Sequence, residues 1–112
     1  MPIMFGFARQ REELLRGELR RIAAELPALG AIRAYLVGNL VSGRVEPDSE
    51  LELILVQATD EPFHRRADFW VTHLRPRFGT RFQVYTPREV EQLGASDPIL
   101  RDARCLGEVI LG

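Results

Sequence analysis

The sequence contains no lysine and almost no net charge. Its 15 basic residues are therefore all arginines, and with 16 acidic residues they give a formal net charge of −1 over 112 residues. A chain with this balance has no global field that would draw it to nucleic acid or to an anionic membrane. We therefore expect neither nucleic acid nor a membrane among its partners.

Cysteine and long apolar runs are also scarce. Cys105 is the single cysteine, so no disulfide can form within the chain, as is typical of a reducing compartment. A lone cysteine in a helix-like stretch is most often a small core residue. No run approaches the roughly 20 apolar residues of a membrane span, and the first ten residues lack the features of a signal peptide. We expect a cytoplasmic protein in which residues 1–112 form one domain.

Hydrophobic spacing predicts a first amphipathic helix over residues 9–26. Leu15, Leu19, Ile22 and Leu26 recur at intervals of four, three and four residues, which places them on one helix face. The further predicted elements are strands over 32–37, 51–56 and 81–85, helices over 60–74, 86–93 and 96–106, and a tail at 108–111 that is either an edge strand or a docked terminus. This order predicts an α/β (α+β) fold, with helices packed on a small mixed sheet.

The same patterns predict which side chains face the core. They are Leu51, Leu53 and Leu55, then Phe63, Ala67, Val71 and Leu74, then Phe82 and Val84, then Ile99, Leu100, Ala103 and Leu106. Gln83 and Tyr85 take the opposite face of their strand. Thr59 or Asp60 is the expected cap of helix 60–74, and Thr86 with Glu89 forms a capping box. We interpret the arginines around helix 60–74 as a solvated positive face: Arg65, Arg66, Arg75, Arg77 and Arg81.

One segment carries a spaced motif. Gly38-Asn39 is followed, after ten residues, by Glu50-Leu51-Glu52. This layout resembles the Gly-Ser, ten residues, Asp-x-Asp motif of minimal nucleotidyltransferases in the DNA polymerase β-like superfamily. Phe82 to Pro87 resembles the third strand of these proteins, which often carries a third acid before a Thr-Pro helix start.

The resemblance implies a nucleotidyltransferase fold and a set of site residues. Gly38, Asn39, Ser42 and Arg44 would bind the nucleotide, with the triphosphate at Gly38 and Asn39. Glu50 and Glu52 would be the catalytic residues that hold Mg²⁺, since acids at positions i and i+2 of a strand point to one face. The third acid position is held by Gln83.

The motif keeps the family spacing but changes its chemistry. Glutamate moves each carboxylate out by one methylene relative to aspartate, about 1.5 Å, whereas Mg²⁺ demands near-octahedral ligands. Gln83 is a neutral amide, which cannot act as a general base. Ser42 stands where many family members carry an arginine, a loss that Arg44 partly compensates.

Two functions follow from this resemblance. The first is transfer of a nucleoside monophosphate from an NTP to a protein or small-molecule hydroxyl with Mg²⁺, at impaired activity. The alternative is a catalytically inactive binding or regulatory subunit, antitoxin-like, for a helical HEPN-type partner or in a homo-oligomer. A third hypothesis is an accidental motif match in an unrelated domain, which a structure with Gly38 far from Glu50 and Glu52 would establish.

Overall fold

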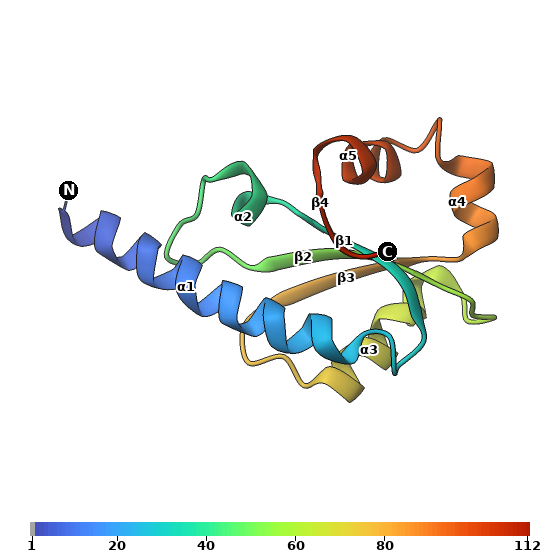
Figure 1. The fold of residues 1–112 in the computed structure, drawn as a ribbon, viewed down its shortest axis with the longest axis horizontal. Helices are drawn as coiled ribbons and strands as arrows, with labels where there is room; N and C mark the ends of the chain where they lie inside the picture. Colours follow the sequence, from blue (N-terminus) through green and yellow to red (C-terminus); the bar gives the residue numbers. More distant parts are fainter. Residues whose placement is uncertain (1) are drawn as a thin grey trace.

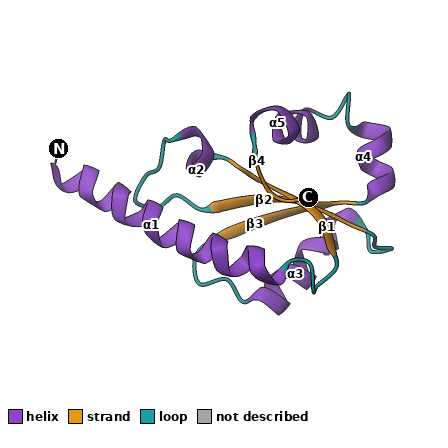
Figure 2. Ribbon diagram, in the orientation of Figure 1, coloured by secondary structure: helices purple, strands orange, loops and turns teal. Residues whose placement is uncertain are grey.

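The protein is a four-stranded sheet covered by helices on both faces (Figures 1 and 2). The computed structural model describes residues 2–112, which contain five α-helices and one 3₁₀ helix. The elements in chain order are α1 (Pro2–Glu25), β1 (Ala31–Val37), α2 (Asn39–Ser42), β2 (Leu51–Gln57), η1 (Phe63–Arg65), α3 (Arg66–Leu74), β3 (Thr80–Tyr85), α4 (Pro87–Leu93), α5 (Pro98–Leu106) and β4 (Glu108–Leu111). The predicted mixed α/β architecture is confirmed.

The sheet has the strand order β3-β2-β1-β4 and is mixed. β1 pairs antiparallel with both β2 and β4, whereas β2 pairs parallel with β3. The parallel step is possible because η1 and α3 carry the chain across the sheet between β2 and β3. The tail at 108–111 is thus an edge strand, which settles the alternative left open by the sequence.

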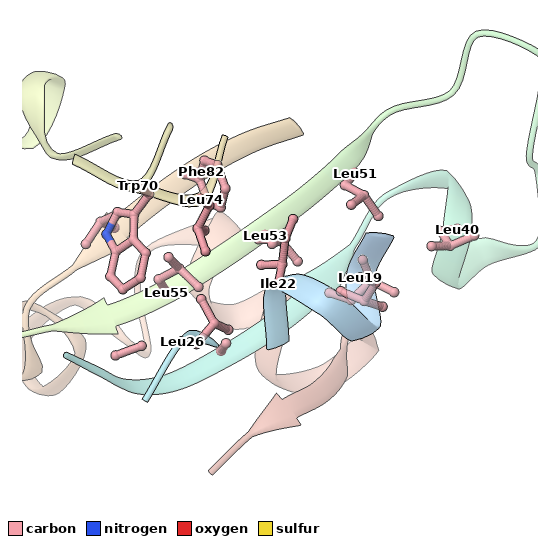
Figure 3. Packing of buried hydrophobic residues seen from close by; sticks show 14 of the residues in the cluster. Leu19, Ile22, Leu26, Leu40, Leu51, Leu53, Leu55, Trp70, Leu74 and Phe82 are labelled. Atoms are coloured by element: carbon pink, nitrogen blue, oxygen red, sulfur yellow. The ribbon is translucent and has the colours of Figure 1, made fainter. Parts of the chain in front are cut away.

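Strand β2 is buried on both faces and separates two layers of helices. Leu51, Leu53 and Leu55 face α1 and α3 and are almost fully buried. This layer also contains Leu15, Leu19 and Ile22 of α1, Leu26 directly after it, Trp70 and Leu74 of α3, and Phe82 and Val84 of β3. Figure 3 labels most of these side chains. The predicted inward face of the first helix is confirmed, although α1 begins at Pro2 and is therefore longer than expected.

A smaller cluster lies on the opposite face, under α4 and α5. It joins Ile54 of β2 and Tyr85 of β3 to Leu100 and Ala103 of α5. Two predicted start signals position these helices. Thr86 and Glu89 form the capping box of α4, with both reciprocal hydrogen bonds present, and the Asp97 carboxylate accepts from the Ile99 N–H at the start of α5.

Helix α3 buries different residues from those that the sequence spacing suggested. Thr59 does not cap it, because its hydroxyl accepts from the Glu61 N–H and Pro62 precedes the intervening 3₁₀ turn. Phe63 and Val71 are exposed, while Trp70 and Leu74 pack in the core with Ala67 at its margin. The 3₁₀ turn shifts the phase of the helix, so the buried face runs through Arg66, Trp70 and Leu74 at spacings of four.

Arg66 is buried and bound, which corrects its assignment to a solvated face. Its guanidinium donates to both carboxylate oxygens of Glu89, at 2.6 and 3.1 Å, and to the Val84 carbonyl at 3.0 Å. These hydrogen bonds hold the pKa of Glu89 below its ordinary value. The other arginines of that group are exposed.

Three further predictions about burial are wrong. Cys105 is exposed, and so are Ile99 and Leu106 on the same helix. The reason is that α5 touches the sheet through Leu100 and Ala103 alone, so its other sides face outward. Within the described part of the chain, no helix has the length and apolar character needed to cross a membrane.

A buried carboxylate connects α1 to the segment before β3. Glu18 is only 5% exposed, and its oxygens accept from the Arg21 guanidinium and from the Arg77 backbone N–H. The hydrogen bonds from Arg21, followed by the Arg77 N–H, lower the pKa of Glu18 against the opposing effect of burial. Since the ionised form is favoured in the folded protein, this carboxylate stabilises the fold when it carries its charge.

Glu18→Gln should lower the free energy of unfolding at pH 7 by about 1–3 kcal/mol, because a charged acceptor for two donors is lost. The folded pKa lies below the ordinary value of 4.5, so the stabilisation is complete above that pH and is lost as the pH falls further. Urea unfolding at pH 7 and pH 3 measures both effects. Exposed Glu13 on the same helix provides the control: Glu13→Gln should leave the free energy of unfolding unchanged at both pH values. Equal effects of the two variants would contradict the stabilising role of the Glu18 carboxylate.

Candidate functional site

The pairing of β1 with β2 brings the two halves of the sequence motif together. Val37, the last residue of β1, lies opposite Glu52 in the register, so Gly38 emerges beside the Glu52 side chain. A β-carbon built on Gly38 would collide with the Glu52 carboxylate, at 2.8 Å from its Cδ. Gly38 also has φ 85° and ψ −155°, a conformation essentially restricted to glycine. Residue 38 is therefore glycine for two independent reasons.

The loop after Gly38 is held in shape by a buried serine. Ser49 accepts a hydrogen bond from the Asn39 side-chain amide at 3.3 Å and one from the Glu46 N–H at 2.8 Å. The Arg11 side chain of α1 donates to the Ser49 carbonyl at 2.9 Å. The Asn39 side-chain amide is thus engaged in fixing the loop.

An open cleft of about 740 Å³ lies on the α5 face of the sheet. Its floor is formed by β2 and β3, one wall by α2 with the following loop, and the opposite wall by α5. The lining residues are Val37, Gly38, Asn39, Val41, Ser42, Arg44, Glu52, Leu53, Ile54, Arg81, Gln83, Ile99, Asp102, Leu106 and Gly107. This volume falls in the range of small-molecule sites.

Most of the residues predicted for the site line this one cleft. They are Gly38, Asn39, Ser42, Arg44, Glu52 and Gln83. Glu50 does not join them. Its carboxylate packs against Gly79, where an added β-carbon would lie 2.8 Å from Glu50 Cδ, and its Oε1 lies 4.0 Å from the Arg81 guanidinium. The two glutamates of the motif therefore contact different residues: Glu50 lies against Gly79 and Glu52 against Gly38.

The donor atoms do not form a typical magnesium site. Among residues 2–112, no group of three or more histidine, cysteine, aspartate or glutamate side chains is placed to hold a metal ion. Gln83 brings a neutral Oε1 that is buried and has no hydrogen-bond partner among the described residues. Glu52 is the one carboxylate that the strands contribute to the cleft. Asp102 lines the opposite wall on α5, so the strands offer only one carboxylate and one amide, a poor match for a hard divalent cation.

Nine of the fifteen lining residues were not predicted for the site from the sequence, and four of these add a charge or form the α5 wall. Arg81 lies on the floor beside Glu52, and Ile99, Asp102 and Leu106 form the α5 wall. Alternation in β3 could have placed Arg81 on the same face as Gln83. The spacing of three, four and seven residues along α5 could likewise have grouped its three wall residues. The missing information was that this face of α5 borders a cleft rather than the core.

The architecture resembles that of a solved structure. A solved structure described as a putative nucleotidyltransferase from Sulfolobus solfataricus superposes with a TM-score of 0.60 at 14% sequence identity, over 77% of this chain and 79% of that one. The chain has a nucleotidyltransferase-like fold. No protein-family model matches the sequence, and no curated protein matches it. At this identity the likeness concerns the fold alone.

The β1–β2 pairing of this nucleotidyltransferase-like fold brings the two halves of the sequence motif together. Gly38 lies beside Glu52, so the structure does not show the wide separation that would have established an accidental match. The roles of Glu50 and Glu52 in holding Mg²⁺, and of Gly38, Asn39, Ser42 and Arg44 in binding nucleotide, stay predictions.

Gly38→Ala should destabilise the protein by more than Gly43→Ala. Both positions have positive φ, but a β-carbon at Gly43 meets no atom within 4 Å, whereas one at Gly38 meets Glu52. We expect a cost of about 1–2 kcal/mol at Gly43, and a larger one at Gly38. Urea unfolding of both variants, and of Gly38→Ala combined with Glu52→Ala, tests the contact. The double variant should recover only the part of the excess cost that comes from the contact, because the backbone conformation of residue 38 stays unfavourable for alanine. Strict additivity would show that the Gly38–Glu52 contact is unimportant.

Proposed function

We propose that the protein binds a nucleoside triphosphate in this cleft, as a nucleotidyltransferase-like protein with impaired transfer chemistry. The observation that carries the proposal is the convergence of Gly38, Ser42 and Arg44 with Glu52 and Gln83 on a single cleft. These residues come from three strands or loops that are up to 45 positions apart in the chain. Their meeting on one cleft in a nucleotidyltransferase-like fold is what the nucleotide hypothesis requires.

The α2 wall suits the phosphate groups. Gly38 lacks a side chain, so its backbone permits close approach of a ligand. The Ser42 hydroxyl now donates to the Asn39 carbonyl at 3.2 Å and is exposed, so it can turn to a phosphate oxygen. Arg44 is exposed on the same wall, and its guanidinium matches the geometry of phosphate oxygens.

The α5 wall suits the apolar part of a nucleotide. Ile99 and Leu106 are exposed to the cleft, and Leu106, at 72%, is the most exposed of the large apolar side chains described. Val41 faces them from the α2 wall. A base or sugar between these side chains would remove apolar surface from water, which favours binding. The free Oε1 of Gln83 can accept a hydrogen bond from an N–H or O–H of the ligand.

The set of residues needed for transfer is less complete than the set suited to binding. Transfer would use Mg²⁺ at Glu50 and Glu52, yet Glu50 packs against Gly79 outside the cleft lining. Gln83 cannot take a proton from an attacking protein or small-molecule hydroxyl. We therefore propose nucleotide binding as the main property and transfer as impaired.

Calorimetric titration with ATP, GTP, CTP and UTP tests the binding proposal. At least one should bind below millimolar concentration, and Arg44→Gln should weaken that binding about tenfold or more, through loss of a charge-assisted hydrogen bond. Arg88→Gln is the matched control, because Arg88 is an exposed arginine of α4 outside the cleft. Absence of binding by any of the four nucleotides to folded protein would overturn the proposal.

A second candidate function, the regulatory subunit of a helical HEPN-type partner, is favoured by α1. The N-terminal part of this helix projects beyond the sheet (Figure 1). Phe7 and Leu14, seven residues apart on one side of the helix, are 51% and 46% exposed. Exposed apolar side chains on one side of a projecting helix are suited to packing against another helix or against a second copy of the chain.

Co-expression with a small helical protein encoded beside this chain tests the second function. We expect a complex stable to gel filtration, which the double variant Phe7→Glu, Leu14→Glu should disrupt, because each charge would be buried in an apolar interface. The control variant Glu12→Gln, Glu13→Gln alters exposed positions of the same helix. A complex unaffected by the double variant would exclude α1 as the interface.

A further inference from the structure

We propose that the Arg81 guanidinium takes the place of a divalent cation in the cleft, so that nucleotide phosphates bind without Mg²⁺. This inference rests on the proposed nucleotide binding and specifies its chemistry. It concerns a residue that the sequence motif does not include. Arg81 is the β3 neighbour of Glu52, and its guanidinium lies 4.0 Å from the Glu50 carboxylate.

The sheet register sets that position. Arg81 is the residue of β3 that lies beside Glu52 of β2 in the parallel pairing. Neighbours in a parallel pair share a face of the sheet, so the Arg81 and Glu52 side chains both enter the cleft. The Arg81 guanidinium also lies 4.0 Å from the Glu50 carboxylate. A positive charge thus lies 4.0 Å from the Glu50 carboxylate and on the same face of the sheet as Glu52, the two acids that would have held a metal.

This arrangement disfavours a metal ion at the same place. A divalent cation bound to Glu50 and Glu52 would have to displace the guanidinium or lie beside its like charge. It would also have to draw Glu50 away from Gly79. Gln83 gives no negative charge in return for these costs, because its side chain is a neutral amide. The positions of Glu50 and Arg81 and the neutral side chain of Gln83 thus all act against a bound divalent cation.

Arg81 is free to bind an anion. Its side chain is 71% exposed and that of Glu50 is 42% exposed, so the ion pair between them is weak. A phosphate group can therefore recruit the guanidinium at little cost. Arg44, on the α2 wall of the same cleft, supplies a second guanidinium. Two arginines that bind phosphate oxygens directly can serve the neutralising role that Mg²⁺ serves at other triphosphate sites.

The nucleotide experiment compares ATP binding in EDTA with binding in excess Mg²⁺. We expect binding in EDTA to be at least as tight, and Arg81→Gln to weaken it about tenfold or more while Arg88→Gln has no effect. Binding that appears only with Mg²⁺, or that Arg81→Gln leaves unchanged, would overturn this inference and leave the proposed function intact. Absence of binding by ATP and by the other three nucleotides in both buffers would instead count against the proposed site.

A metal titration tests the cation-exclusion step without any nucleotide. Mn²⁺, detected by its electron paramagnetic resonance, should bind wild-type protein more weakly than millimolar. The double variant Arg81→Gln, Gln83→Asp should bind it at least tenfold more tightly, because it removes the competing charge and restores an acid. The control Arg88→Gln, Gln92→Asp makes the same changes on exposed α4. Tight Mn²⁺ binding by the wild type, or no gain in the double variant, would overturn the inference.

Discussion

The structure depends on the alternation of side chains along β2. Leu51, Leu53 and Leu55 point to α1 and α3, whereas Glu52 and Ile54 point to α5. Because the period of a strand is two residues, a shift of the β1–β2 register by one would send glutamate into the core and leucine into the cleft. Correct packing of α1 and correct formation of the site are thus one and the same condition. The hydrophobic core enforces the pairing that puts Val37 opposite Glu52.

Buried charges then fix the elements that the apolar layer leaves free to slide. Glu18 connects α1 to the Arg77 backbone, and Arg66 connects α3 to β3 and α4 through Val84 and Glu89. Both carboxylates of these pairs have lowered pKa values because arginine side chains donate to them. Apolar contacts are non-directional, whereas these hydrogen bonds require one relative position of the elements they join.

Local signals predicted most of the fold. The capping residues Thr86 and Asp97, the faces of β2 and β3 and the inward side of α1 depend on neighbours within a few positions, so sequence alone revealed them. The errors concern residues whose surroundings are set by distant partners. Arg66 is buried because Glu89, 23 positions away, accepts its charge. Glu50 leaves the cleft because the parallel pairing of β2 with β3 brings Gly79 beside it. The six remaining predicted site residues share the cleft because apolar alternation specifies both the β1–β2 register and the β2–β3 register.

The two glutamates of the motif each contact a glycine of a neighbouring segment. Glutamate at position 52 reaches one methylene further than aspartate, and its carboxylate occupies the volume that a β-carbon on residue 38 would fill. Glycine there serves the backbone conformation and also makes room for the longer acid. Glu50 similarly extends over Gly79, next to Arg81. Each longer acid is thus accommodated by a glycine, and the carboxylates are drawn apart instead of converging on one cation.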